Sequence, residues 1–157
     1  MYKTNVTYEN FDGETVTKTL YFNLTEAEMT KIYLRYDGKF DQYVDSIVHP
    51  TDEDGNKVAP NPGKVISLFE MLALEAYGVR NEDNDFVKDE KKTKAFLSSE
   101  AYSKFFMNLL SDENAQQEFF IGIMPKEISA KVAEEFKENK EKTLQELKEV
   151  QGISVSE

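Results

Sequence analysis

The chain has 157 residues and no cysteine, and 19 lysines and arginines against 30 aspartates and glutamates give a formal net charge of −11. This length suits one domain with a sizeable core, and the missing cysteines exclude disulfides, thiolate zinc sites and cysteine nucleophiles. The negative charge opposes binding to nucleic acid and anionic membranes. Because no signal-peptide core or membrane-spanning apolar run is visible, we expect a soluble protein, cytoplasmic where it is made.

A β-hairpin is predicted over residues 5–22. Asp12-Gly13 is a favoured tight-turn pair, and β-branched and aromatic residues flank it. Lys18 interrupts the apolar face of the second strand, as suits an edge or a strand end. Since a two-stranded ribbon is not stable by itself, we expect helices or further strands to pack against it.

Two short helices are predicted next. Thr25 and Glu28 have the spacing of a capping box, which starts the first helix, and its apolar stripe continues towards Gly38. Apolar residues then recur at i, i+3, i+4 and i+7 over residues 40–47. This pattern predicts the second helix.

The most apolar helix is predicted over residues 61–80. Asn61 can cap it, and Pro62 suits the first helical position. Gly78 is expected to end it in a left-handed conformation, and Arg80 to neutralise its carbonyl end. Because apolar residues run nearly all the way round, the helix is expected to be buried on most sides.

The acidic stretches that begin at Asp52 and at Asn81 are predicted to be solvated loops. The second lies in a charged connection over residues 81–94, whose apolar pair Phe86-Val87 is expected to fold back onto the core. An EF-hand loop needs glycine at position six and glutamate at position twelve. Counted from Asn81, those positions hold Phe86 and Lys92, and the first stretch fails the same test. His49 is the only histidine, and no phosphate-binding or nucleophile motif is present. No catalytic, metal or cofactor site is predicted, and we do not expect an enzyme.

Three more helices complete the prediction. The first begins at Ser98 or Ser99, and the second begins at Ser111-Asp112. The third is long, over residues 126–150, and a wholly polar stretch at 138–143 divides its apolar stripe. It fits either a solvated terminal helix or an arm that binds a partner. The candidate partner-binding residues are Leu144, Leu147, Val150, Phe119 and Phe120.

Together these elements predict an α+β fold, a mainly α-helical single domain with an N-terminal β-hairpin and a long C-terminal helix. The hairpin and helical body are expected over residues 1–124. The C-terminal helix and a frayed tail are expected over residues 125–157 of the same domain.

Several segments together resemble the tail assembly chaperones, and related small virion-associated proteins, of tailed phages. They are the hairpin, the run from Ala76 to Asp83, Phe86-Val87-Lys88, Ser99-Glu100-Ala101-Tyr102 and Phe105-Phe106. The resemblance covers most of residues 5–124, and the last helix lies outside it.

This resemblance implies a non-enzymatic protein of phage morphogenesis that works in the host cytoplasm. It implies that the protein binds the tape-measure protein, or other tail proteins, and keeps the long helical client soluble while tail subunits assemble around it. The alternative is a structural component, a tail or capsid accessory protein, that stays in the mature virion. Self-association is left open.

Overall fold

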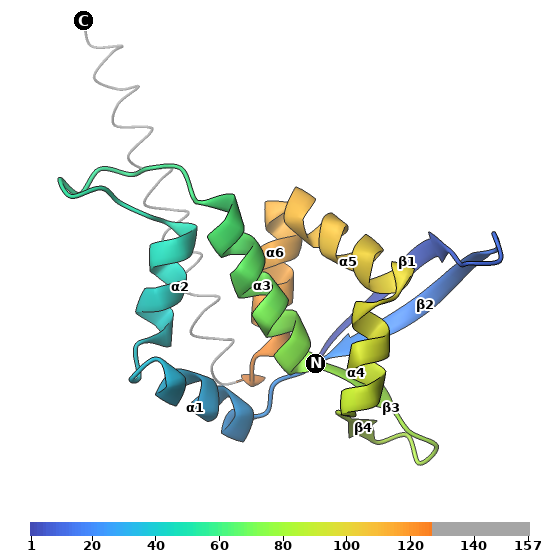
Figure 1. Cartoon of the computed structure of the whole chain (residues 1–157). Coiled ribbons are helices and arrows are strands. Elements are labelled where there is room, and N and C mark those ends of the chain that lie inside the picture. Colours follow the sequence, from blue (N-terminus) through green and yellow to red (C-terminus); the bar gives the residue numbers. More distant parts are fainter. Residues whose placement is uncertain (127–157) are drawn as a thin grey trace, which may run out of the picture. The chain divides into compact units, whose positions relative to one another are not determined.

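The computed structural model describes residues 1–126 and confirms the predicted α+β fold (Figure 1). In chain order the elements of this range are β1 (Tyr2–Glu9), β2 (Thr15–Phe22), α1 (Glu26–Arg35), α2 (Phe40–Val48), α3 (Pro62–Ala76), β3 (Tyr77–Arg80), β4 (Phe86–Val87), α4 (Glu90–Leu97), α5 (Glu100–Ser111) and α6 (Glu113–Ile123). The chain divides into two compact units, Met1–Pro125 and Lys126–Glu157. That both belong to one domain stays a prediction, and the predicted C-terminal helix lies outside the described residues beyond its start.

The predicted hairpin is confirmed, and it begins at Tyr2 instead of residue 5. β1 and β2 pair antiparallel along their whole length. The turn depends on Asn10 as well as on Asp12-Gly13, because the Asn10 Oδ1 accepts the backbone N–H groups of Asp12 and Glu14 at 3.0 and 2.9 Å. Gly13 has φ +78°, a conformation that glycine adopts without steric cost.

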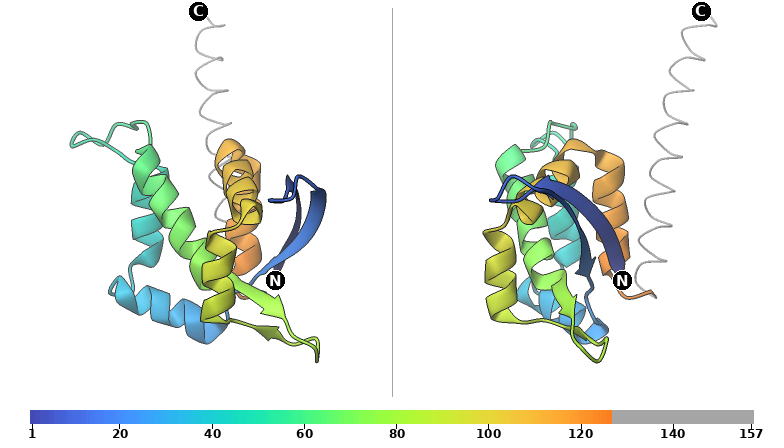
Figure 2. Two further views of the ribbon diagram at one scale, coloured as in Figure 1. Left: turned by 45° about the vertical axis from the view of Figure 1, so that its right-hand side comes forward. Right: turned by 90° about the vertical axis from the view of Figure 1, so that its right-hand side faces the viewer.

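The sheet continues beyond the hairpin, in the order β1-β2-β3-β4. β2 pairs with β3 only through Tyr21 and Phe22. The rest of β2, including Lys18, is therefore an open edge on that side, as its sequence suggested. Figure 2 shows α5 and α6 between this hairpin and α3, and both helices contact β1.

The end of α3 corrects the prediction made for Gly78. This glycine is not left-handed: α3 stops at Ala76, and the chain passes directly into the extended strand β3. A Cβ at Gly78 would lie 2.3 Å from the Cζ of Phe86 on the neighbouring strand. Glycine is therefore needed here because an aromatic ring lies against the backbone.

The stretch predicted as a charged loop contains both β4 and the start of α4. Asp89 caps α4, because its Oδ1 accepts the N–H groups of Lys91 and Lys92 at 2.9 and 3.3 Å. An N-cap aspartate followed by Glu90 in the first turn is a helix-start signal present in the sequence. The expected return of Phe86-Val87 takes the form of β4 pairing with β3, and both residues stay half-buried. The apolar residue that reaches the core lies later, at Phe96 on α4.

Phe22 lies at the centre of the core and is 0% exposed. Five aromatic rings surround it at centroid distances between 4.7 and 6.2 Å. They belong to Tyr2, Tyr77, Phe96, Phe105 and Phe119. Such aromatic pairs stabilise a core beyond the area that they bury. One residue of β2 thereby joins β1, β3, α4, α5 and α6.

The two residues after Phe22 bind the ends of two helices. The Asn23 N–H donates to the carbonyl of Ala76 at 2.8 Å, and the Leu24 N–H donates to the carbonyl of Ile123 at 2.7 Å. Both carbonyl groups lie in the last turn of their helix, α3 or α6. Carbonyl groups in that position have no hydrogen-bond donor within their own helix. The predicted capping box then starts α1: Thr25 Oγ1 accepts the Glu28 N–H, and Glu28 Oε1 accepts the Thr25 N–H.

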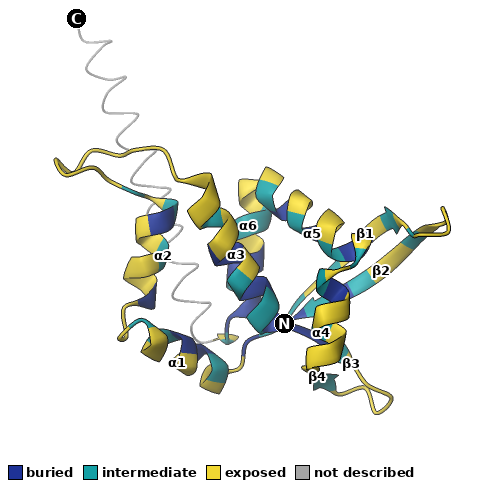
Figure 3. Ribbon diagram, viewed as in Figure 1, coloured by how far each residue is buried: buried dark blue, intermediate teal, exposed yellow. Residues whose placement is uncertain are grey.

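The prediction that α3 is buried on most sides is wrong for part of its surface. Five of its residues are buried: Leu68, Phe69, Leu72, Ala73 and Ala76. Met71 and Leu74 are only half-buried, and Ile66 is exposed. Figure 3 shows this division along α3. The partly open side is the one that forms a cleft with α4.

Replacing Gly78 by alanine should lower the free energy of unfolding by about 1 to 3 kcal/mol, because the new methyl group must displace the Phe86 ring. Urea denaturation measures this change. In a Phe86→Ala background the same substitution should cost almost nothing, since the clashing ring is gone. An equal cost in both backgrounds would show that the packing of Phe86 is not the reason for the glycine.

Candidate functional site

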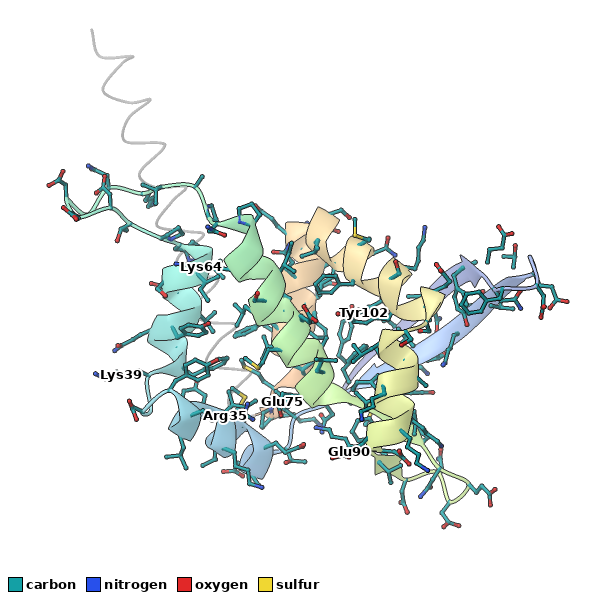
Figure 4. All side chains as sticks on the ribbon, in the orientation of Figure 1. Arg35, Lys39, Lys64, Glu75, Glu90 and Tyr102 are labelled. Carbon is teal, nitrogen blue, oxygen red and sulfur yellow. The ribbon has the colours of Figure 1, made fainter. Side chains whose placement is uncertain are left out.

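A cleft of about 870 Å³ lies between α3 and α4. We call it the α3–α4 cleft. Its apolar lining consists of Met71, Leu74 and Tyr77. Its charged lining consists of Glu28, Glu70, Glu75, Asp89, Glu90, Lys88 and Lys94. Figure 4 labels Glu75 near the end of α3 and Glu90 at the start of α4.

One stripe of α3 forms one wall of this cleft. Ser67, Glu70, Met71 and Leu74 have the spacing i, i+3, i+4 and i+7, which places their side chains on a single helical face. The stripe therefore combines two apolar side chains with a carboxylate and a hydroxyl. Such a face can contact both the apolar and the polar part of another element.

Aromatic stacking holds α4 beside α3. Tyr77, directly after α3, stacks on Phe96 of α4 with ring centroids 3.9 Å apart and an interplanar angle of 7°. Phe96 in turn meets Tyr102 of α5 edge to face at 5.3 Å. Burial, and after it the charge of Glu70, raises the pKa of Tyr102 above its ordinary value. Glu70 therefore lies close enough to Tyr102 for its charge to act on the phenol.

Lys88 closes one end of the cleft by binding two other elements. Its Nζ donates to Glu28 Oε2 on α1 at 2.5 Å and to the backbone carbonyl of Glu75 on α3 at 2.7 Å. A cation at the carbonyl end of a helix is stabilising. The sequence prediction gave this role to Arg80, which instead donates to Asn84 Oδ1 and lies 5.3 Å from the Tyr21 ring centroid.

Burial alone would raise the pKa of Glu28. The hydrogen bond from Lys88, the bonds from the Thr25 backbone and side chain, and the charge of Lys88 together outweigh burial. The pKa of Glu28 therefore lies below its ordinary value. Glu28 stays ionised in the cleft at neutral pH.

The cleft carries an excess of negative charge. Five carboxylates and two lysines line it. Glu28 is paired with Lys88, and Glu75 with Arg35 at 2.8 Å. Within residues 1–126 no ion pair neutralises Glu70, Asp89 or Glu90. The cleft thus favours a ligand with positive charge next to its apolar surface.

The predicted partner-binding residues divide into two groups. Phe119 and Phe120 are 0% and 8% exposed, so they offer a partner almost no surface in this fold. Phe119 instead contacts the rings of Phe22 and Phe69 in the core. The other group, Leu144, Leu147 and Val150, lies outside the described residues. The α3–α4 cleft was not predicted from the sequence. Ser67 and Glu70 were a signal for it, because polar residues on an otherwise apolar helix indicate a side that is not packed in the core.

Large apolar side chains are also exposed away from the cleft. Phe11 at the hairpin turn is 88% exposed, Leu34 on α1 68% and Met107 on α5 61%. They lie on the hairpin turn, α1 and α5, and none of them lines the cleft. Single exposed apolar residues of this kind are normal in soluble folds.

Residues 1–126 contain no group of three or more histidines, cysteines, aspartates or glutamates placed to hold a metal ion. In the same part of the chain, no helix is both long and apolar enough to cross a membrane.

Met71 and Leu74, half-buried on the partly open face of α3, form a surface on which the apolar side of another helix can pack. The family comparison is more specific. The sequence matches the family model described as phage tail assembly chaperone over residues 1–157, so the chain belongs to that family. The sequence resemblance is thereby confirmed, and the chain takes part in phage tail assembly. No curated protein and no solved structure matched it.

Replacing Glu28 by glutamine should separate charge from capping, because glutamine can still accept the capping bond at this position. At pH 7 the variant should lose up to about 1 kcal/mol of unfolding free energy through the lost ion pair with Lys88. Because the folded pKa of Glu28 is lowered, its charge stabilises the fold above the ordinary value of 4.5. This stabilisation is lost as the pH falls through the lowered pKa.

Denaturant titrations from pH 7 into the acid range measure this dependence. The two stability curves should converge at acidic pH. Glu26→Gln, in the same helical turn, is the matched control and should show a smaller dependence. A difference between wild type and Glu28→Gln that stays constant down to low pH would contradict the role given to the charge.

Proposed function

We propose that this protein binds the tape-measure protein in the host cytoplasm and keeps it soluble while tail subunits assemble around it. The observation that carries the proposal is the family match over the whole chain. The protein acts by binding and not by catalysis. It leaves when the tail is complete and is absent from the mature particle.

The structure offers physical support for a helical client. Met71 and Leu74 are half-buried on a partly open helical face, and a methionine side chain adapts readily to different apolar partners. An amphipathic helix can lay its apolar face into such a cleft. The net charge of −11 then keeps the complex with an apolar client in solution.

A tape-measure protein expressed alone should be largely insoluble, and co-expression with this chain should move it into the soluble fraction. The two should co-elute on a sizing column. Mass spectrometry of purified virions should detect the tape-measure protein and not the chaperone. A client that stays insoluble would refute the proposal. Detection of the chain in virions at the level of a tail subunit would favour the alternative, a structural tail or capsid accessory protein.

The segment after residue 126 is a second candidate for partner binding, because its sequence fits either a solvated terminal helix or a binding arm. Leu144, Leu147 and Val150 form an apolar stripe beyond the polar stretch 138–143. An isolated helix of this length is only marginally stable in water, so a partner would stabilise it. We include in the proposal that this stripe contributes to client binding or to self-association.

Truncation after Lys142 should leave the melting temperature within a few degrees of wild type while weakening co-purification with the client or changing the oligomer size. A full-length variant with Leu144, Leu147 and Val150 changed to alanine is the matched control for chain length, and it should behave like the truncation. Loss of the cooperative thermal transition in either variant would show that the segment supports the fold.

A further inference from the structure

We propose that the α3–α4 cleft binds an amphipathic client helix that carries lysine or arginine beside a short apolar stripe. The inference rests on the proposed function only for the identity of the client. It specifies where on the chaperone the client binds and which chemistry in the client is recognised.

The size of the cleft fits a few side chains of one helical face. The α3 stripe from Ser67 to Leu74 extends over about 10 Å, given a rise of about 1.5 Å per residue. A facing helix presents about two turns over this length, so only a few side chains of its inward face can enter the cleft. The client helix therefore lies along the opening and inserts apolar residues spaced i and i+3 or i+4.

The apolar lining fits this kind of contact. Met71 and Leu74 are partly accessible, while Tyr77 is 3% exposed and fixed by its stack on Phe96. Tyr77 therefore backs the cleft as a fixed ring, and the accessible apolar surface belongs to Met71 and Leu74. The adaptable methionine lets this surface accept related but different apolar side chains.

Charge complementarity decides which helix is recognised. Glu70 lies on the α3 wall, and Asp89 and Glu90 lie at the start of α4, so carboxylates flank the apolar lining on two sides. A helix with lysine or arginine on both edges of its apolar stripe can pair with them. An acidic helix would be repelled.

Charge also disfavours a second copy of this chain as the occupant of the cleft. The chain has a formal net charge of −11, and residues 127–157 contain more glutamates than lysines. Like charges brought together at an interface cost binding free energy. The client is therefore a different protein, and its binding should weaken as salt concentration rises, because salt screens exposed charges.

Two synthetic helical peptides test the chemistry without any assumption about the client. Both carry the same apolar stripe, flanked by lysines in one peptide and by glutamates in the other. The full-length chain should bind the lysine peptide at least about 10-fold more tightly at low salt, a difference that should shrink at high salt. Equal affinity for both peptides would overturn the inference.

Substitutions in the chain locate the site. Glu70→Lys combined with Glu90→Lys should weaken binding of the lysine peptide about 10-fold or more. Glu82→Lys combined with Glu113→Lys changes the net charge equally at exposed positions outside the cleft lining, and should have an effect of less than about 3-fold. Thermal unfolding confirms that each variant is folded. Equal weakening by both pairs would show a general charge effect and refute the cleft as the site.

A tape-measure fragment that co-purifies with the full chain then tests the client. The Glu70→Lys, Glu90→Lys variant should no longer co-purify with the fragment. Met71→Gln should weaken the binding of the fragment while the charge of the cleft stays the same. A fragment that binds wild type and cleft variants alike would overturn the inference and leave the proposed function intact. If wild type binds the lysine peptide at the cleft but binds no tape-measure fragment, the proposed function fails and the assignment of the cleft holds.

Discussion

The packing of Phe22 is the interaction on which the rest of the described structure depends. Its buried ring contacts aromatic side chains from two other strands and three helices. The backbone directly after it binds the last turns of α3 and α6 through the Asn23 and Leu24 N–H groups. A short sheet and several small helices, each marginal alone, thereby share one core.

The same core determines the geometry of the α3–α4 cleft. Phe96 reaches Phe22 and stacks on Tyr77, which places α4 beside the end of α3. Lys88 then joins α1 and α3 at the end of the cleft. Because the most deeply buried side chains hold the fold, Met71 and the flanking carboxylates can remain accessible without loss of stability.

Local chemistry determined most of the helix starts and the first hairpin. The capping residues Thr25, Asn61, Ser99 and Asp112 could be read from the sequence because a cap bonds to backbone groups only two or three residues away. Asp12-Gly13 marked the hairpin for the same reason. The acidic surface and the tail assembly family also follow from the sequence alone.

Only the tertiary structure decided what surrounds each residue. Gly78 resembles a helix terminator locally, but Phe86 from the next strand is what requires it. β4 has two residues, too few for a periodic pattern, and it exists because β3 pairs with it. Apolar periodicity could not separate Phe119, which is buried, from Met71, which lines the cleft. Periodicity reports which face of a helix is apolar, whereas burial depends on which distant elements pack against that face.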